Sequence, residues 1–383
     1  MTALPPASTL RAEWDLAPGL HYLNHGGFGG VPRVVREAAD AIRAEADANP
    51  TDFLTRTYWD RLLRVRRRVA TFLHADPEGL VFVPNATAGI ATVLAAMRLA
   101  PGDEVVTTDH CYGAVRVALE QTPADLRIAT VPLDSESDEQ VVEAILAETS
   151  ARTKAIVVDH VASSSGFTFP VDAIVRAAHE RDIAVCIDAA HALAMLDVDV
   201  TALDADYWVG NLHKWLCAPR SAAVIVAAPQ HRDMLRPLVP SHMYGEGLHL
   251  AFDWTGTYDP APVLAAPAAI NWLTHLGWEQ IRARQRDLAA GGAAAIALAL
   301  GTRVPVDEHF ASALRVAELP QPLTFDQARA VERRLLEDHR IEVPIMAMTG
   351  AWRLVRVSGA IYNEPADYEA LARALPHVLP QSR

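Results

Sequence analysis

Apolar and polar residues alternate with two different periodicities in the middle of the chain. Between residues 79 and 226, short runs rich in β-branched residues are separated by longer segments with helical spacing of apolar positions. The pattern predicts strands at Leu80–Val83, Glu104–Thr108, Arg127–Val131, Ala155–Asp159, Ala184–Ile187, Tyr207–Val209 and Ala222–Val226. It predicts helices at Thr87–Leu99, Ala114–Thr122, Asp138–Thr149 and Val171–Arg181. Because the strands are continuously apolar, we expect an α/β fold with a mostly parallel seven-stranded sheet covered on both faces.

The segments before and after this α/β region have different patterns. Residues 240–262 are rich in Gly, Pro and aromatic residues and predict a long loop, and helical sequence follows from Pro262 to Leu300. The last part predicts strands at Leu314–Glu318 and Trp352–Val357 and helices at Thr324–His339 and Pro365–Leu375. We therefore expect an N-terminal segment (1–20), a large α/β domain (21–260), and a linking helix with a smaller C-terminal α+β domain (261–383).

The charge balance narrows the classes of function. The 383 residues carry a formal charge of −13, with 34 basic against 47 acidic side chains, so we expect neither a nucleic acid nor a membrane as partner. A local basic patch at Arg64 and Arg66–Arg68 alternates with leucine and valine, which predicts the solvated face of a helix. Three cysteines in a long chain, and no secretory signal within Met1–Leu10, favour a cytoplasmic protein.

Lysine is rare in this chain. Lys154 and Lys214 are the only two, and every other basic residue is an arginine. Arginine cannot form a Schiff base because its guanidinium stays protonated, so the two lysines are candidates for that chemistry. Lys214 lies beside His213, Trp215 and Leu216, partly apolar surroundings that should lower the pKa of the amine. Lys154 precedes a predicted strand, at the end of the sheet where we expect it to be solvated.

Polar residues follow the predicted strands at the edge where parallel strands end. Ligands of open parallel sheets bind in the crevice at that edge. The five loops are Asn85–Gly89, Asp109–Tyr112, His160–Gly166, Asp188–His191 and Asn211–Lys214. Together they bring Asp, His, Asn, Thr and one of the two lysines to one edge, which predicts a ligand-binding crevice there.

Each loop also has an ordinary structural interpretation. Asn85–Gly89 opens a helix and could hold a phosphate at the helix N-terminus, or only cap that helix. Asp188 ends a very apolar strand, where a carboxylate needs a cationic partner such as a protonated pyridine nitrogen, or it is a turn aspartate. His191 could hold a ring substituent or cap a helix.

Motifs for other cofactors are missing from the sequence. The glycines within His25–Gly30 lack the G-x-G-x-x-G spacing of a dinucleotide site, because Pro32 stands where the third glycine belongs. No C-x-x-C or H-E-x-x-H motif occurs, so we expect no metal site, and Ser163–Ser165 does not form a G-x-S-x-G elbow. Pyridoxal phosphate is the cofactor that accounts together for a lysine, an aspartate and a phosphate loop.

Eight motifs carry a family resemblance: Tyr22–Gly29, Asn85–Thr87, Asp109–Tyr112, His160–Ser163, Asp188–Ala192, Gly210–Leu216, Trp254–Thr257 and Arg356–Ser358. With these motifs in order over nearly the whole chain, the sequence resembles the class V aminotransferase superfamily of fold-type I pyridoxal-phosphate enzymes. Within it, the sequence is most similar to the isopenicillin N epimerase-like branch. The resemblance implies chemistry at the α-carbon of an amino acid or an amino-acid conjugate.

The resemblance also implies roles for single residues. Lys214 would carry the cofactor as an imine and move the Cα proton, and Asp188 would pair with the pyridine nitrogen. Either His110 or Tyr112 would stack on the ring. The residues implied to approach the ring oxygen and the phosphate are Ser163, His191, Asn85, Ala86, Thr87, Asn211, His213 and, from a second subunit of a homodimer, Thr257. The residues implied to meet the substrate are Arg356, through the carboxylate, with Asn24, His25 and Tyr258.

The sequence departs from the branch at two places. Tyr258 stands where the branch often has arginine, and Ser221, which follows Arg220, stands where it often has glycine. Three functions remain open: an epimerase, a β-eliminating C–S lyase acting on a cysteine S-conjugate, or a non-catalytic ligand-binding module on the same scaffold. Desulfuration through a persulfide is disfavoured, since no cysteine follows Cys217.

Overall fold

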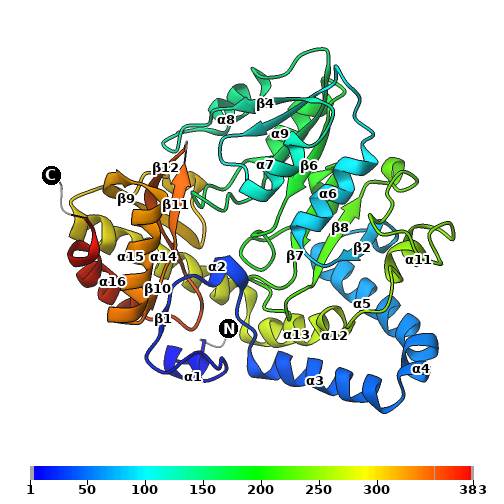
Figure 1. Cartoon of the computed structure of the whole chain (residues 1–383), viewed down its shortest axis with the longest axis horizontal. Coiled ribbons are helices and arrows are strands. Elements are labelled where there is room, and N and C mark those ends of the chain that lie inside the picture. The colour runs from blue at the N-terminus through cyan, green and yellow to red at the C-terminus, as the bar shows by residue number, and fades with distance from the viewer. Residues whose placement is uncertain (1–3, 349, 381–383) are drawn as a thin grey trace.

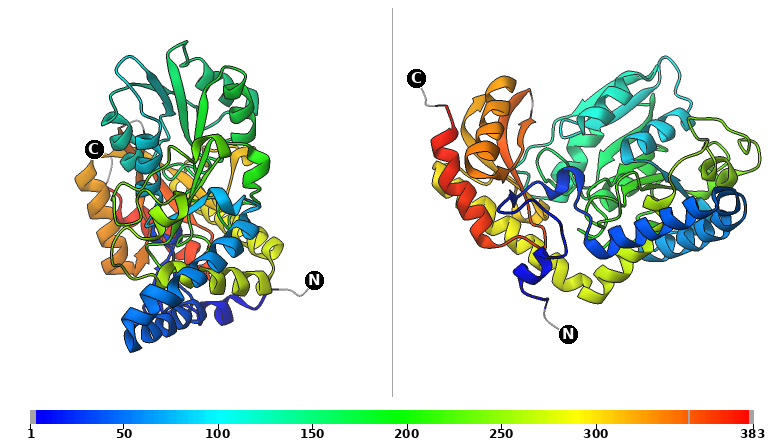
Figure 2. Two further views of the ribbon diagram at one scale, coloured as in Figure 1. Left: turned by 90° about the vertical axis from the view of Figure 1, so that its right-hand side faces the viewer. Right: turned by 60° about the horizontal axis from the view of Figure 1, so that its bottom comes forward.

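The computed structural model describes residues 4–348 and 350–380 and forms two units (Figure 1). The larger unit is built around a seven-stranded sheet, and the smaller one contains the C-terminal strands and helices. The long helix α14 (Trp278–Leu300) packs in the small unit, while α12 (Ala261–Leu264) and α13 (Ala266–Leu276), which precede it, pack on α3 (Arg33–Ala48) of the large unit. Figure 2 shows α3 running along the outside of the large unit.

The large sheet confirms the expected mostly parallel, seven-stranded architecture. Its strands are β2 (Leu80–Val83), β3 (Glu104–Thr108), β4 (Asp125–Ala129), β5 (Thr153–Asp159), β6 (Ala184–Asp188), β7 (Tyr207–Asn211) and β8 (Ala223–Ala227). Their order is β2-β8-β7-β6-β5-β3-β4, and only β8 runs antiparallel to its neighbours. Strand β4 ends two residues before the expected Val131, because the Val131 N–H bonds to the Asp109 carboxylate instead of the sheet (3.0 Å).

Helices cover both faces of the sheet. Helices α6 (Ala86–Ala96) and α7 (Gly113–Glu120) pack on one face, and α8 (Asp138–Leu146) and α9 (Val171–His179) on the other. Successive side chains along β5 point to opposite faces of the sheet: Val157 packs on the face covered by α6 and α7, and Ile156 on the face covered by α8 and α9. Both are buried. Burying each such side chain is worth about 1.5–3 kcal/mol, so a strand with two apolar faces requires a helical layer on each side.

The predicted solvated arginine patch and the predicted long loop both need correction. Arg66 lies on α5 (Tyr58–Leu73) but is buried, because it forms an ion pair with Asp253 (2.5 Å) and lies over the Phe82 ring. Asp253 ends a helix, α11 (Leu248–Asp253), inside the segment expected to be loop. The cation of α5 therefore anchors that helix instead of facing water.

The small unit is built on an antiparallel sheet of order β11-β12-β9. Its elements are β9 (Leu314–Leu323), α15 (Phe325–His339), β10 (Ile341–Glu342), β11 (Ile345–Met348), β12 (Ala351–Ser358) and α16 (Pro365–Val378). The N-terminal strand β1 (His21–Tyr22) pairs in parallel with β10, so the chain start joins the small unit. The remaining short elements are α1 (Ala7–Arg11), α2 (His25–Phe28), α4 (Pro50–Asp52), a π-helical turn Phe53–Thr57, α10 (Val200–Leu203) and the 3₁₀ turns Pro77–Gly79, Pro229–His231 and Glu308–Phe310.

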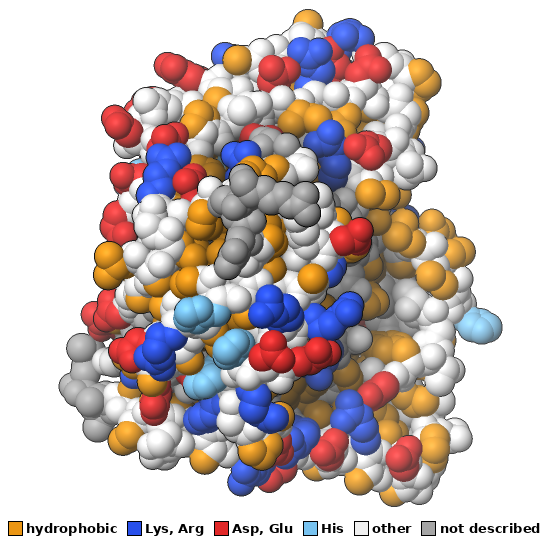
Figure 3. All heavy atoms as spheres, turned by 60° about the vertical axis from the view of Figure 1, so that its left-hand side comes forward, with side chains coloured by type: hydrophobic (Ala, Val, Ile, Leu, Met, Phe, Trp, Pro, Cys, Tyr) orange, Lys and Arg blue, Asp and Glu red, His pale blue; other side chains and the backbone are white. Residues whose placement is uncertain are grey.

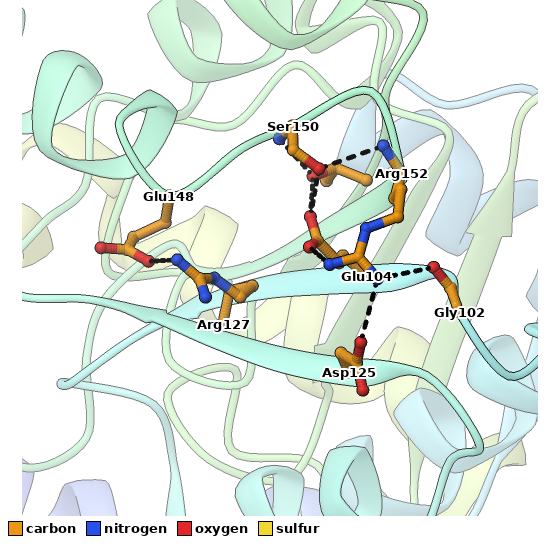
Figure 4. Close-up of polar contacts among 8 residues, drawn as sticks. Gly102, Glu104, Asp125, Arg127, Glu148, Ser150 and Arg152 are labelled. Atoms are coloured by element: carbon orange, nitrogen blue, oxygen red, sulfur yellow. Dashed lines mark hydrogen bonds and ion pairs between the residues drawn. The ribbon is translucent and has the colours of Figure 1, made fainter.

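The amino ends of the parallel strands carry a structural network. The buried Glu104 carboxylate accepts hydrogen bonds from Ser150 and Arg152, both 2.5 Å, and Arg152 reaches Asp125 at 3.2 Å (Figure 4). Lys154 is the second residue of β5, at this end of the sheet, and is exposed. The carboxyl ends of the same strands, with Lys214 beyond β7, lie at the other edge.

The surface shows no preference for one charge on the face formed mainly by the small unit. Basic and acidic side chains are intermixed there (Figure 3). Among the described helices, none combines the length and apolar character needed to cross a membrane.

Candidate active site

Lys214 lies just beyond β7 with its amine against His191. Lys214 Nζ is 3.1 Å from His191 Nε2, and the Trp215 indole N–H donates to His191 Nδ1 at 3.2 Å. Because Nδ1 accepts, neutral His191 carries its proton on Nε2 and can donate it to an unprotonated lysine amine. Burial lowers the pKa of Lys214 to about 8 and lowers that of His191 well below its usual value. The neutral amine, the form that attacks carbonyl groups, is therefore reached at a lower pH than in a solvated lysine.

Asp188 ends β6 as a buried carboxylate. One oxygen accepts from the Ala190 N–H at 3.0 Å, and the hydrogen bonds of the described residues include none from a side chain to it. Burial raises the pKa of Asp188, while the Lys214 ammonium opposes that rise. A second carboxylate, Asp159, lies beside it as its register partner on β5. Asp159 is not among the expected site residues, although it too is an acid at the end of an apolar strand, the pattern that indicates Asp188.

The start of α6 presents backbone donors. Asn85 caps the helix by accepting from the Ala88 N–H, and Asn211 Oδ1 accepts from the Ala86 N–H, both at 2.9 Å. The described residues provide no acceptor for the Thr87 N–H or hydroxyl between them, and the side chain is exposed. An eleven-residue helix adds its dipole, so this terminus suits an anion. The structure thus joins the Asn85–Thr87 loop directly to the Asn211 loop.

His213, the residue before Lys214, is held in place by a hydrogen bond to the segment that precedes β8. Its Nδ1 donates to the Ala222 carbonyl at 2.9 Å, and burial lowers its pKa. Gly29 packs against the His213 carbonyl with φ +69°, and a Cβ there would lie 2.0 Å from that oxygen. The N-terminal glycine cluster is therefore a close backbone contact that positions the lysine loop.

Arg356 connects the small unit to the site. One nitrogen donates to Ser163 Oγ (3.0 Å) and to the Ser163 carbonyl (2.6 Å), and another donates to Asn24 Oδ1 (2.9 Å). The buried Nε–H has no partner among the described residues. Burial lowers the pKa of Arg356 to about 10, and its charge in turn lowers the pKa of Lys214. A fixed cation with an open donor near the amine suits a carboxylate.

The structure separates the two candidates for stacking. His110 is buried in the core, with Nδ1 2.8 Å from Ser165 Oγ and Nε2 2.8 Å from the Val131 carbonyl. Two phenylalanine rings, Phe167 and Phe169, contact it edge-on. Tyr112 precedes α7 and is 44% exposed, and its phenol faces the Arg356 charge. Of the two, Tyr112 has a ring free to meet a ligand.

Of the remaining residues of the substrate and phosphate set, His25 hydrogen-bonds to the backbone of Lys214, whereas Thr257 and Tyr258 make no contact with Lys214 among the described residues. His25 is buried, with Nδ1 2.9 Å from Tyr362 Oη and Nε2 3.9 Å from Cys217 Sγ. Tyr258 Oη is 2.6 Å from Tyr58 Oη. Thr257, just before it, is exposed in the loop after α11.

The residues present fit pyridoxal phosphate. A lysine with a lowered pKa, a buried carboxylate without a bonded cation and open donors at a helix N-terminus lie at one edge of the large sheet. A buried arginine with an unpaired Nε–H reaches this edge from β12 of the small unit. These match in turn an aldehyde, a ring nitrogen, a phosphate and a substrate carboxylate. Among the described residues, no cluster of three or more His, Cys, Asp or Glu side chains is placed to hold a metal ion.

Comparison with known proteins identifies the family. The family described as Aminotransferase class-V matches residues 29–371. Isopenicillin N epimerase of Amycolatopsis lactamdurans is 31% identical over 391 residues, which cover 95% of this chain and 96% of that protein. Putative L-cysteine desulfhydrase 1 of Oryza sativa subsp. japonica is 29% identical over 415 residues, covering 96% and 85%.

A solved structure shows the same fold. The complex of the cystine C-S lyase C-DES with its reaction product cysteine persulfide superposes with a TM-score of 0.83 at 17% identity, covering 95% of this chain and 99% of that one. The fold, the residues that match the cofactor and the family match over most of the chain agree. The chain therefore belongs to the class V aminotransferase family and is a pyridoxal-phosphate-dependent enzyme.

Proposed function

We propose that the enzyme moves the Cα proton of an amino acid or amino-acid conjugate, with Lys214 as both the cofactor-bearing lysine and the acid–base group. The observation that carries this proposal is the Lys214 amine, with a pKa of about 8, held 3.1 Å from His191 Nε2 on the sheet edge that Arg356 also faces. A general base works best when its pKa lies near the working pH.

The chain supplies a separate group for each part of the cofactor. We assign the phosphate to Asn85, Ala86, Thr87, Asn211 and His213 and the ring nitrogen to Asp188. Ser163 accepts from Arg356, so its own hydroxyl proton remains available for the ring oxygen, which His191 would also approach. Tyr112, in preference to His110, would cover the ring face. When bound, pyridoxal phosphate supplies an electron sink for the pair released at the α-carbon.

Substrate is held through its carboxylate. Arg356 keeps its guanidinium plane fixed through Ser163 and Asn24, which leaves the Nε–H for the α-carboxylate. Asn24 therefore acts on the substrate through Arg356. His25 is engaged with Tyr362, so its contribution is to the shape of the pocket wall.

Epimerisation is the first of two proposed outcomes. Lys214 removes the Cα proton, and a proton returned to the opposite face inverts the centre; the similarity to an isopenicillin N epimerase supports this outcome. Loss of a β-sulfur substituent after the same abstraction gives an enamine and then a keto acid, which the similarity to an L-cysteine desulfhydrase supports.

Burial raises the pKa of all three thiols, that of Cys217 to about 12, so a persulfide-forming thiolate is disfavoured.

We propose a homodimer with shared sites. Large apolar side chains are exposed, among them Phe28 (67%) at the end of α2 and Tyr258 (39%) in the loop after α11, and such side chains mark an interface. Thr257 in the same exposed loop is free to reach a partner's phosphate. The three free cysteines support a reducing compartment, the cytoplasm.

The test compares the two lysines. Lys214→Ala should abolish the imine absorption and the exchange of Cα hydrogen with solvent deuterium, while Lys154→Ala should leave both unchanged. Release of keto acid and thiol would select the lyase, and exchange with inversion alone the epimerase. A borohydride-reduced adduct on Lys154 would refute the assignment. Full chemistry is expected after replacing Cys111, Cys186 and Cys217 by serine or alanine.

A further inference from the structure

Asp159 is a buried carboxylate to which the proposed function gives no role. It ends β5 beside Asp188, which ends β6, and the two residues are register partners in adjacent parallel strands. Such partners place their side chains on the same face of the sheet, with strands about 4.8 Å apart. Two residues earlier, Val157 and Cys186 pack on that face with Ile90 of α6. Only 5% of Asp159 and 4% of Asp188 is exposed.

One cation faces the two carboxylates. The charged or titratable groups around the pair are the Lys214 ammonium, the Cys111 thiol beyond β3 and the Cys186 thiol on β6. Burial raises the pKa of both thiols, so they stay neutral. The hydrogen bonds of the described residues include none from a side chain to either carboxylate, and only the Ala190 N–H reaches Asp188.

Two adjacent buried carboxylates cannot both ionise easily. Each negative charge opposes the other in a site with little water, and the pair then retains a proton. Burial and the charge of Asp188 raise the pKa of Asp159 well above its usual value. A backbone N–H favours the ionised form of each carboxylate, that of Ala190 for Asp188 and its own for Asp159. Because the charge of Asp188 acts in addition on Asp159, Asp159 is the member that carries the proton.

We propose that Asp159 and Asp188 hold one proton between them in the cofactor-free protein, and that this pair releases it to solvent when the protonated pyridine ring of the cofactor binds beside Asp188. The O–H bond of Asp159 breaks and its proton passes to water, while the ring N–H, which the cofactor already carries near neutral pH, would donate to Asp188. Both carboxylates are then ionised beside a pyridinium cation, which removes the repulsion. The inference rests on the role proposed above for Asp188 and makes Asp159 the residue that gives up the shared proton.

Difference infrared spectroscopy of the cofactor-free full chain at neutral pH tests the shared proton. A protonated-carboxyl band should be present in the wild type and lost in Asp159→Asn. Asp206 is a matched control: it is buried at the amino end of β7, and hydrogen bonds from His231, Val185 and His179 lower its pKa to about 2. Asp206→Asn should therefore retain the band.

Two results would overturn the shared proton. One is a wild-type spectrum with no protonated-carboxyl band, and the other is a band that survives in Asp159→Asn. If circular dichroism shows that Asp159→Asn does not fold, the wild type alone decides, because its band must be present near neutral pH and disappear as the pH rises. A wild-type spectrum without that band from about pH 6 to about pH 9 contradicts the proposal.

Calorimetry tests the release of the proton. Pyridoxal phosphate is titrated into cofactor-free protein in buffers of different ionisation enthalpy, which counts the protons exchanged with solvent. Asp159→Asn should release about one proton fewer than the wild type, because it holds no shared proton. Equal release by the two proteins would refute the proposal. The imine absorption lost in Lys214→Ala tests the proposed function separately, since the infrared band belongs to the protein without cofactor.

Discussion

At the scale of single residues, Arg356 and Arg353 make a matched pair on one strand. Both lie on β12, Arg356 in its regular part and Arg353 at the irregularity between Trp352 and Leu354, where the strand pairing shifts. Arg356 is buried against Ser163 and Asn24, whereas Arg353 is exposed. The two side chains are chemically identical and differ only in their surroundings.

Arg356→Lys should raise the KM for the amino-acid substrate about tenfold to hundredfold, because a charge-assisted hydrogen bond is worth about 1.5–3 kcal/mol. Cofactor absorption should be retained, because the cofactor does not depend on this donor. Steady-state kinetics and absorption spectra measure the two effects. Arg353→Lys should leave KM unchanged, and equal behaviour of the two variants would remove the distinction.

The lowered pKa of Lys214 predicts how cofactor capture depends on pH. Burial lowers it from the model-peptide value of 10.5 to about 8, against the opposing effect of Asp188. The neutral amine is the reactive form, so the rate of imine formation by cofactor-free protein should rise about tenfold per pH unit up to about pH 8 and then level off. Stopped-flow absorption measures the rate. A rise continuing to pH 10 would show an unshifted lysine.

The backbone conformation at Ser221 is one that suits the glycine often found there in the isopenicillin N epimerase-like branch. Its φ of 73° lies in the left-handed region, where glycine has no steric penalty and serine costs about 1 kcal/mol. Because the side chain is exposed, Ser221→Gly should stabilise the protein, by up to about 1 kcal/mol. Urea unfolding measures the change. A loss of stability would mean that the serine hydroxyl makes a contact in the assembled enzyme.

At the scale of elements, one buried ion pair holds α5 to α11. Arg66 and Asp253 are 2.5 Å apart with side chains 3% and 7% exposed, and Asp253 is followed by the segment that carries Thr257 and Tyr258. The Tyr58 hydroxyl of α5 also donates to the Asp253 carbonyl at 2.8 Å. Helix α5 thus fixes the start of the loop that is proposed to reach the partner.

Arg66→Met should cost about 3–5 kcal/mol of unfolding free energy, because it leaves Asp253 as an uncompensated buried charge. The double variant Arg66→Met with Asp253→Leu should recover part of that loss, since it removes both charges. Arg67→Met, on the exposed side of the same helix, is the control and should change stability little. A full loss for the double variant would indicate that packing, not the lone charge, dominates.

At the scale of the whole molecule, the site is proposed to need two chains. Lys214 and Thr257 would then come to one site from different subunits. Lys214→Ala and Thr257→Ala homodimers should both be impaired, and mixing them after mild dissociation should restore about a quarter of wild-type activity, because half of the random dimers contain one intact site. Activity assays with sedimentation measure this. Lack of recovery in mixed dimers, or full activity of a monomer, would refute shared sites.

The sequence by itself determined the central features of this protein. The alternation of apolar strands and helices requires a covered, mostly parallel sheet, and parallel strands bring their carboxyl ends to one edge. That rule places Asp188 and Lys214 together, and the scarcity of lysine singles out Lys214. These conclusions rest on period and composition, which act locally along the chain.

Tertiary structure decided what depends on partners distant in sequence. Arg66 and Arg67 are neighbours with the same side chain, yet only Arg66 meets Asp253. His110 and Tyr112 share one motif, yet Ser165 and the Val131 carbonyl hold the histidine in the core. The two-residue strands β1 and β10 form because the chain start returns to the small unit. Asp159 and Asp188 become a pair only when β5 and β6 align in register, because a side chain's charge state depends on neighbours that the fold, not the local pattern, provides.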